Sequence, residues 1–274
     1  MILNTNLKNK SYATNNPDHS DFGIRASDID ISNLPVHIKP EQIRDEIPTL
    51  NKTGYMKFEF EHFSKSFVEY ARAAQRPVLE IGTAYGWVTH KVLETGATIV
   101  AADICQEHLE VLLKETKEEH LDKLYVYRGA FPEELAFKPK SFDAIFMSRI
   151  LHFLKGEEVE RGLKKIHSWL APKGKFIATN CSIYHSSVKK NMHKIFEERI
   201  ALKHQWPGLV TKEDFDKVHE NYSPSFLNTF YKEQLEELMP KHGFKIETIE
   251  YFDYPSDPWP DEGKGHIGFI ASKI

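Results

Sequence analysis

The clearest chemical signal in the sequence is a short glycine turn with an acidic residue on each side of it. Glu80 begins the pattern E-x-G-x-x-x-G, which Gly82 and Gly86 complete, and Asp103 follows the next apolar run. Glycine lets the backbone of a turn come close to a ligand, and a carboxylate accepts hydrogen bonds at both of its oxygens. These residue types predict a site that binds a small polar ligand at the turn.

The elements around the turn place these residues at one edge of a sheet. The apolar runs 78–81 and 98–102 predict two buried strands. Between them, 87–94 predicts a helix that ends at Thr95-Gly96, because glycine suits the position after a helix C-terminus. Asp103 then stands at the carboxyl end of the second strand of a β-turn-α-β unit. Ligands of such sheets bind outside the carboxyl ends of the strands.

Two common phosphate-binding turns are excluded by the residues present. A dinucleotide-binding G-x-G-x-x-G fails because Ala84 and Trp87 stand where its second and third glycines would be. A P-loop requires G-K-[ST], which does not follow Gly86.

The pattern that remains resembles the class I S-adenosylmethionine-dependent methyltransferases. E-x-G-x-x-x-G followed by Asp103 is similar to their cofactor motif. FDAIFMSRILHFL at 142–154 resembles their fourth strand and the segment after it, and L-x-P-x-G at 170–174 resembles their turn into strand five. The resemblance covers roughly residues 77–180, in the family's order.

The resemblance implies S-adenosylmethionine as the cofactor and S-adenosylhomocysteine as its product. In the family the turn wraps the methionine half of the cofactor, the first acid lies near the ammonium group, and the second acid binds the ribose hydroxyls. The loop at 128–132 would flank the adenine, although Ala130 stands where the family frequently has Asp. The implied cofactor-binding residues are Glu80, Gly82, Thr83, Ala84, Gly86, Asp103, Ile104, Ala130, Phe131 and Ser148.

Simpler structural roles exist for three of these residues. For Glu80 the alternative is a strand-end acid that caps the turn after it, and for Asp103 it is the N-cap of the helix that starts at Gln106. Phe131 either contacts the adenine or fills a gap in the core.

The fold that follows is a Rossmann-like, doubly wound α/β sheet of seven strands, and the resemblance implies that the last strand runs antiparallel. The expected division is a flexible tail at 1–22, a helical extension at 23–76 and a methyltransferase domain at 77–274. That domain holds an inserted lid at about 181–228, after strand five. A long helix is predicted at 58–74, which either closes over the cofactor or covers the sheet edge.

The residues for the methyl acceptor are less determined. His152 follows strand four, where a general base would face the reacting centre, and Tyr184 and His185 follow strand five. These three are the candidate catalytic residues; a structural role is the alternative for each. Arg149 borders the cofactor or holds a substrate carboxylate. The aromatic insertion predicts a lid over a small molecule, an extra packing layer or a contact in a homodimer.

Composition limits the partners and the compartment. The 274 residues carry a formal charge of −4, no apolar run of the length that spans a membrane, and no apolar signal-peptide core at the start. The two cysteines, Cys105 and Cys181, suit a reducing compartment and lack zinc-site spacing, so no metal is expected. We therefore expect a cytoplasmic protein. The chain also lacks [DN]-P-P-[YFW] after strand four and a Pro-Cys nucleophile, and both absences argue against a nucleic-acid substrate.

The function predicted from these residues is methyl transfer from S-adenosylmethionine to an oxygen or nitrogen of a small molecule. Two alternatives stay open. One is a macromolecular methyltransferase that uses the insertion to dock protein or RNA. The other is a non-catalytic protein that binds S-adenosylmethionine as a sensor or scaffold.

Overall fold

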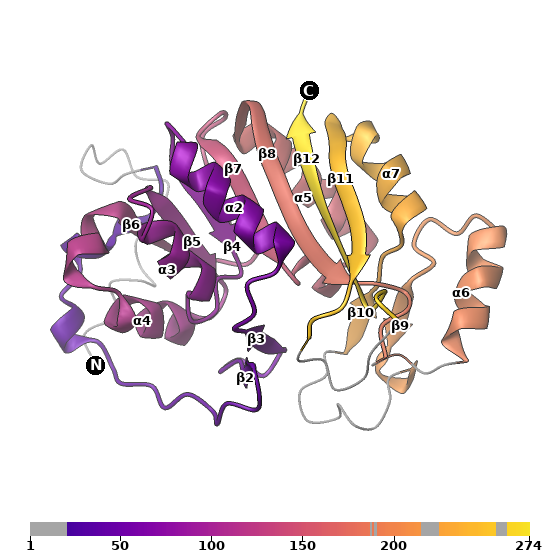
Figure 1. Ribbon diagram of the computed structural model, residues 1–274, viewed down its shortest axis with the longest axis horizontal. Helices are drawn as coiled ribbons and strands as arrows, with labels where there is room; N and C mark the ends of the chain where they lie inside the picture. The colour runs from indigo at the N-terminus through magenta and orange to yellow at the C-terminus, as the bar shows by residue number, and fades with distance from the viewer. Residues whose placement is uncertain (1–20, 187, 189–190, 215–224, 256–261) are drawn as a thin grey trace.

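An eight-stranded sheet forms the centre of the protein in a computed structural model, which describes residues 21–186, 188, 191–214, 225–255 and 262–274 (Figure 1). The strand order is β1-β6-β5-β4-β7-β8-β12-β11. The strands are β1 (Ile24–Arg25), β4 (Val78–Ile81), β5 (Ile99–Asp103), β6 (Leu124–Arg128), β7 (Phe142–Ser148), β8 (Leu170–Cys181), β11 (Phe244–Phe252) and β12 (His266–Lys273).

The sheet confirms the predicted Rossmann-like order and adds one strand to it. Strands β6, β5, β4, β7 and β8 are parallel, whereas β12 is antiparallel to both β8 and β11, as the resemblance implied. The additional strand is β1, which pairs antiparallel with β6 so that Ile24 lies opposite Val126. A strand of two residues shows no alternation in the sequence, which is why a count of seven was expected.

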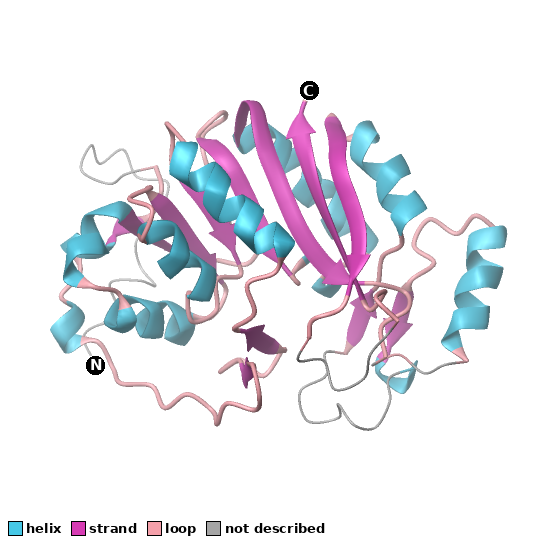
Figure 2. Ribbon diagram, in the orientation of Figure 1, coloured by secondary structure: helices cyan, strands magenta, loops and turns pink. Residues whose placement is uncertain are grey.

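Helices cover both faces of the sheet, and each face has its own apolar core (Figure 2). On one face lie α2 (His62–Ala73), α3 (Trp87–Leu93) and α4 (Gln106–Glu115), whose buried side chains include Phe67, Val92 and Leu112. On the other face lie α5 (Gly156–Trp169) and α7 (Lys232–Lys241), which bury Leu163 and Leu235. The sheet is therefore doubly wound.

The long N-terminal helix starts later than the apolar spacing predicted. Helix α2 begins at His62 because the side chain of Glu61 accepts hydrogen bonds from the backbone N–H groups of Phe63 and Ser64. The residues before it form the hairpin of β2 (Glu46–Pro48) and β3 (Tyr55–Lys57). Ahead of this hairpin, Ile43 and Glu46 form an isolated antiparallel bridge.

The segment after β8 forms a small unit of its own. It holds α6 (Met192–Ala201) and the pair β9 (Leu209–Thr211) and β10 (Phe226–Asn228), packed around Met192, Phe196 and Val210. Five short 3-10 helices complete the described chain: η1 (Ala26–Asp28), η2 (Ile31–Asn33), η3 (Glu118–Lys123), η4 (Leu151–Phe153) and η5 (Lys212–Asp214). The tail expected at 1–22 lies almost entirely outside the described residues. None of the described helices has the length and apolar character that crossing a bilayer requires.

Candidate functional site

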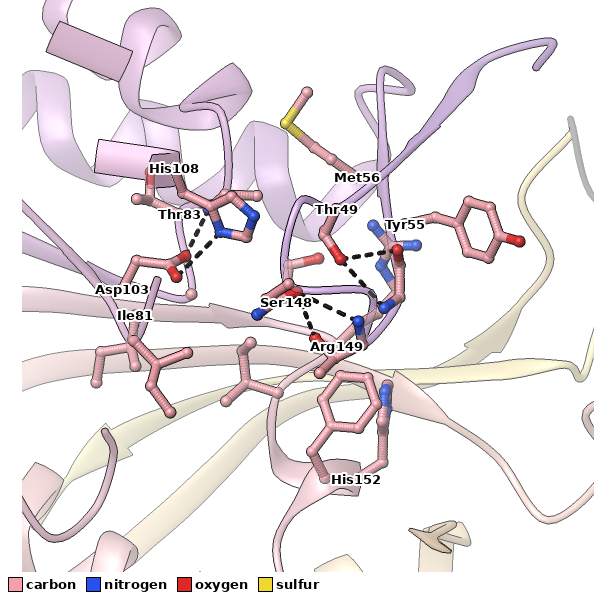
Figure 3. A pocket seen from close by; sticks show the side chains of 18 of the residues that line it. Thr49, Tyr55, Met56, Ile81, Thr83, Asp103, His108, Ser148, Arg149 and His152 are labelled. Carbon is pink, nitrogen blue, oxygen red and sulfur yellow. Dashed lines mark hydrogen bonds and ion pairs between the residues drawn. The ribbon is translucent and has the colours of Figure 1, made fainter. Parts of the chain in front are cut away.

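A cavity of about 830 Å³ opens at the carboxyl ends of β4, β5, β6 and β7 (Figure 3). It also reaches the β2–β3 hairpin, the end of β8 and the start of β12. Of the residues predicted from the sequence, Glu80, Gly82, Thr83, Ala84, Asp103, Ile104, Ala130, Phe131, Ser148, His152 and His185 line it. The position agrees with the rule that parallel sheets bind ligands beyond the carboxyl ends of their strands.

Glu80 is a buried acid held by two hydroxyl groups. The hydroxyl groups of Thr89 and Thr83 donate hydrogen bonds to its Oε2, the latter over 3.3 Å. Burial disfavours the charged form and raises the pKa of Glu80 to about 7, in spite of these hydrogen bonds. The carboxyl group therefore changes charge near neutral pH, at the edge of the cavity.

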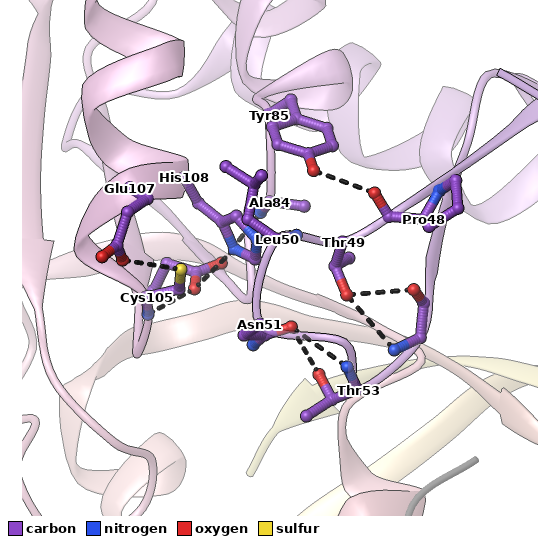
Figure 4. A network of polar contacts seen from close by, with 12 residues as sticks. Pro48, Thr49, Leu50, Asn51, Thr53, Ala84, Tyr85, Cys105, Glu107 and His108 are labelled. Atoms are coloured by element: carbon purple, nitrogen blue, oxygen red, sulfur yellow. Dashed lines mark hydrogen bonds and ion pairs between the residues drawn. The ribbon is translucent and has the colours of Figure 1, made fainter. Parts of the chain in front are cut away.

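Asp103 is the centre of a hydrogen-bond network that reaches the N-terminal hairpin through His108 (Figure 3 shows Asp103 and His108, Figure 4 shows His108 and Leu50). Its Oδ2 accepts from the backbone N–H of Ala84 at 2.9 Å, and its Oδ1 accepts from that of Cys105 at 2.8 Å and from Nδ1 of His108 at 3.1 Å. Nε2 of His108 in turn accepts from the backbone N–H of Leu50 at 3.1 Å. A carboxylate has about four acceptor positions, so three bonds leave Asp103 one position for a ligand hydroxyl.

The hairpin is attached to the glycine turn by a second contact. The hydroxyl of Tyr85 donates to the carbonyl oxygen of Pro48 at 2.9 Å, and Ile47, Met56 and Val111 pack around the ring. The β2–β3 hairpin, and not helix α2, is thus the N-terminal element that covers the turn.

The two motif glycines have different positions. Gly82 has φ of +80° and lines the cavity, and a Cβ placed on it would lie 2.1 Å from Cδ1 of Ile150. Gly86 is not among the residues that line the cavity. It has φ of +83°, and a Cβ there would lie 2.2 Å from Cδ1 of Leu112 on α4. Packing of the turn against α4 thus constrains Gly86, and its contact with the cofactor stays a prediction.

The loop after β6 and the residue after Asp103 supply the apolar wall. Ile104 is 56% exposed although it is a large aliphatic residue, and it lies at the cavity. Phe131 also lines the cavity, but its ring packs toward Gly162 of α5 and lies 6.3 Å from the ring of Trp169. The ring of Phe131 therefore packs against the core at the wall of the cavity, and its contact with the adenine stays a prediction, whereas Ile104 is an exposed apolar side chain there.

The residues at this end fit the polar groups of S-adenosylmethionine. Within the described part of the chain, Nε1 of Trp87 is buried and has no hydrogen-bond partner, and Trp87 lines the cavity near the glycine turn. A buried donor without a partner is unfavourable unless a ligand supplies an acceptor. Trp87 would suit the cofactor's carboxylate, Glu80 its ammonium group and Asp103 its ribose.

The opposite end of the cavity is basic and aromatic. Two cations lie near the ring of Tyr254, with Nζ of Lys57 4.9 Å and Cζ of Arg149 5.5 Å from its centroid. Lys57 also pairs with Glu46 at 3.1 Å. Within the described chain, Nε of Arg149 is buried without a hydrogen-bond partner.

Three histidines and a cysteine complete this end. His152 is buried, and its Nδ1 accepts a hydrogen bond from the backbone N–H of Cys181 at 3.1 Å. Burial, followed by the charges of Arg149 and His185, lowers the pKa of His152 well below its usual value. The neutral ring then carries its proton on Nε2, so neither nitrogen is open to accept another. The pKa of His266 is lowered in the same way, first by burial.

Tyr184 is the one candidate catalytic residue that does not line the cavity. Its ring is 38% exposed and lies 5.7 Å from that of Tyr251 and 5.5 Å from Nζ of Lys264. Sequence reasoning missed Lys57, Tyr254 and His266. The sequence signal for Tyr254 and His266 is their position beside the ends of the last two strands, and Lys57 has no comparable signal.

Comparisons with known proteins agree with this arrangement. Residues 78–174 match the family described as methyltransferase domain. An uncharacterized methyltransferase of Oceanobacillus iheyensis is 24% identical over 173 residues, which cover 63% of this chain and 75% of that protein.

Solved structures of methyltransferases share the fold. An S-adenosylmethionine-dependent methyltransferase from Mesorhizobium loti aligns with a TM-score of 0.55 at 16% identity, over 77% of this chain and 98% of that one. The 1,6-didemethyltoxoflavin-N1-methyltransferase of Burkholderia thailandensis, solved with 1,6-didemethyltoxoflavin and S-adenosylhomocysteine, has a TM-score of 0.53 at 17% identity. That alignment covers 78% of this chain and 79% of the Burkholderia enzyme. Together with the acidic turn and the doubly wound sheet, these matches show that residues 78–174 form a methyltransferase domain, with S-adenosylmethionine as its cofactor.

Proposed function

We propose that the enzyme methylates an oxygen or nitrogen atom of a small molecule that carries an anionic group. The observation that supports this is the division of one cavity into an acidic end, with Glu80 and Asp103, and a basic end, with Arg149 and Lys57. The acidic end fits the cofactor's ammonium and hydroxyl groups. The basic end has cations that the cofactor does not need, and these suit a carboxylate or phosphate on the acceptor.

The size of the cavity supports a small acceptor. Ligand pockets of small molecules measure about 300–1,000 Å³, and this cavity of about 830 Å³ is in the upper part of that range. It is large enough for a cofactor and a compact second ligand. The Burkholderia thailandensis enzyme, which shares the fold over most of both chains, was solved with 1,6-didemethyltoxoflavin and S-adenosylhomocysteine bound together.

The protein's contribution to methyl transfer is alignment and exclusion of water. The bound cofactor supplies an activated methyl group on a positively charged sulfur. The β2–β3 hairpin closes the side of the cavity above the turn through Tyr85 and His108. Because both ring nitrogens of His152 are committed, we assign His152 a positioning role, in which it fixes the end of β8 through the backbone of Cys181. The acceptor atom would then be a neutral amine or an ionised hydroxyl, which needs no base on the enzyme.

The first experiment is calorimetric titration of the protein with S-adenosylmethionine and S-adenosylhomocysteine. Cell extracts are then separated by size and by charge, and each fraction is tested for production of S-adenosylhomocysteine. We expect the activity in the small, anion-retained fraction. Activity only with the macromolecular fraction would contradict the proposal, and cofactor binding with no acceptor in any fraction would favour a sensor or scaffold.

A pair of variants tests the basic end. Arg149→Gln should raise the KM for the acceptor about tenfold or more, as expected when a charged hydrogen bond to the substrate is lost, and leave the affinity for S-adenosylhomocysteine unchanged. Arg161→Gln is the control, because Arg161 pairs with Glu133 on the exposed surface of α5. An unchanged KM in Arg149→Gln would show that this guanidinium does not contact the acceptor.

A further inference from the structure

We propose that Cys181, His185 and His266 form a binding site for a divalent cation of the zinc class, at the acceptor end of the cavity. One ligand atom from each residue, the thiol sulfur and one ring nitrogen of each histidine, lies within 4.8 Å of the other two. All three residues line the cavity, and Cys181 and His266 are buried. This inference goes beyond the proposed function and does not depend on the identity of the acceptor.

The sheet itself brings the ligands together. Cys181 is the last residue of β8 and His266 is the first of β12, and the antiparallel register places them directly opposite each other. Side chains of directly opposed residues lie on the same face of a sheet, with Cβ atoms about 4.5–5.5 Å apart. Two of the three ligands are therefore fixed by the strand pairing before any ion binds.

The third ligand is supplied by the turn that leaves β8. The backbone N–H of Ser182 donates to the carbonyl oxygen of Gly265 at 2.9 Å, which holds the turn against the start of β12. The backbone N–H of His185 donates to Ser182 at 3.2 Å, and its ring lies 4.8 Å from that of His266 at an interplanar angle of 87°. The turn thus directs His185 toward the pair formed by Cys181 and His266.

The set of donors suits zinc. Zinc binds thiolate sulfur at about 2.3 Å and imidazole nitrogen at about 2.0–2.1 Å, usually in a tetrahedron, so its ligand atoms are separated by about 3.3–3.7 Å. The present separations of up to 4.8 Å need to shorten by on the order of 1 Å, which small side-chain rotations can provide. A site with three protein ligands leaves a fourth position, which is the pattern of catalytic zinc sites.

The surroundings determine what the fourth ligand would be. One thiolate neutralises only half of a divalent charge, and Arg149 and Lys57 add positive charge near Tyr254, whose ring lies 4.7 Å from that of His266. Lys57 is compensated by Glu46, so the net positive charge favours an anionic fourth ligand. Hydroxide or an ionised heteroatom of the acceptor has the required chemistry.

Cobalt titration of the wild-type protein tests the site, because Co²⁺ occupies zinc sites and has visible absorption bands. The protein is treated with a chelator, dialysed and titrated with Co²⁺, and the expected result is one equivalent bound with a thiolate-to-cobalt charge-transfer band and the intense bands of tetrahedral Co²⁺. Added Zn²⁺ should remove these bands. No thiolate band in the wild-type protein overturns the proposal, whatever the variants do.

Variants then assign the ligands. Cys181→Ser should abolish the thiolate band, and His185→Gln and His266→Gln should each weaken Co²⁺ binding at least tenfold. Cys105→Ser removes the other thiol of the chain, which lies beside Glu107, and should retain the band. His193→Gln, on α6, should retain the affinity. A band that persists in Cys181→Ser but is lost in Cys105→Ser would overturn the assignment.

Calorimetry with S-adenosylhomocysteine separates this proposal from the proposed function. Normal binding in each variant shows that it is folded. A protein that binds S-adenosylhomocysteine but not cobalt refutes the metal site alone. A protein that binds cobalt and methylates no small anionic molecule refutes the proposed function and leaves the metal site in place.

Discussion

The two ends of the cavity differ in charge and in how the chain builds them. The cofactor end holds two buried acids, Glu80 and Asp103, and both come from one β-turn-α-β unit. The acceptor end holds Lys57, Arg149 and His266, which come from β3, the loop after β7 and β12. The acids of the cofactor end are close together in the sequence, whereas the residues of the acceptor end are far apart in the sequence and are brought together by the fold.

This difference also follows the boundary of the segment that matches the methyltransferase domain family. The segment 78–174 that matches the methyltransferase family contains the whole β-turn-α-β unit. Lys57, Cys181, His185, Tyr254 and His266 all lie outside it. The two acids of the cofactor end therefore lie within the matched segment, whereas the acceptor end takes Arg149 from that segment and its other residues from outside it.

The largest expected effect comes from closing the cofactor end. Gly82→Val should destabilise the fold by roughly 2–5 kcal/mol, because a branched residue at φ of +80° is strained and its side chain would overlap Ile150. Binding of S-adenosylhomocysteine should become undetectable, while the variant is still folded at low temperature. Chemical denaturation and calorimetry measure the two effects.

Gly96 is a matched control for this substitution. It has φ of +82°, and a Cβ there would meet nothing within 4 Å. Gly96→Ala thus measures the backbone strain alone, and Gly82→Ala measures strain and overlap together. Equal losses of stability in the two alanine variants would show that Ile150 does not restrict the turn.

The second effect concerns the charge of Glu80. Its folded pKa of about 7 is raised above the usual value of 4.5, so the protonated form stabilises the fold fully below about pH 4.5, and this contribution is lost as the pH rises through 7. The shift corresponds to about 3 kcal/mol. Glu80→Gln, which is never charged, should therefore be more stable than the wild type at pH 8 by up to about that amount, with little difference at pH 4.5.

Affinity should change in the opposite direction. Wild-type affinity for S-adenosylhomocysteine should increase between pH 6 and 8, as Glu80 ionises and can pair with the ammonium group, and Glu80→Gln should lose this pH dependence. The exposed Glu94→Gln serves as the control for an altered surface charge. If Glu80→Gln were neither more stable at pH 8 nor weaker in binding, the carboxylate would not face the ligand.

The third effect tests whether Asp103 binds the ligand or only holds the hairpin. Asp103→Asn should weaken S-adenosylhomocysteine binding by about 1–3 kcal/mol, since an amide cannot accept all of the hydrogen bonds that the carboxylate accepts. His108→Gln removes the link between Asp103 and Leu50 but keeps the carboxylate. We expect a smaller loss for His108→Gln. Equal losses would assign Asp103 to the hairpin and not to the ribose.

The sequence predicts the cofactor end of the cavity better than the acceptor end. The strands and helices from 78 to 181 agree with the prediction to within a few residues, because apolar runs and turn residues alternate clearly in this segment. The exception is β8, which begins earlier than predicted, at Leu170. The sequence locates the glycine motif but does not distinguish the position of Gly82 from that of Gly86. Leu112, against which Gly86 packs, belongs to another helix, so the sequence alone could not separate close packing from close approach to a ligand.

The acceptor end shows where prediction from sequence stops. Cys181 and His185 are neighbours in the chain, but His266 reaches them only through the pairing of β12 with β8. No spacing rule joins residues across a sheet, and this is why no metal was expected from the positions of the cysteines. Lys57 and Tyr254 meet in the same way, through a hairpin and a loop that are far apart in the sequence.

The smallest effect is expected for Tyr184→Phe, which tests how far the acceptor end extends. Tyr184 and His185 are adjacent and were predicted together, yet only His185 lines the cavity, while the ring of Tyr184 lies against Tyr251 and Lys264. Tyr184→Phe keeps these ring contacts, so kcat, the KM for the acceptor and the stability should all stay within about twofold of wild type, or about 0.5 kcal/mol, as for surface substitutions. A tenfold loss of kcat with normal stability would place the hydroxyl of Tyr184 at the acceptor, and the basic end would then extend beyond β8 onto the outer side of its turn.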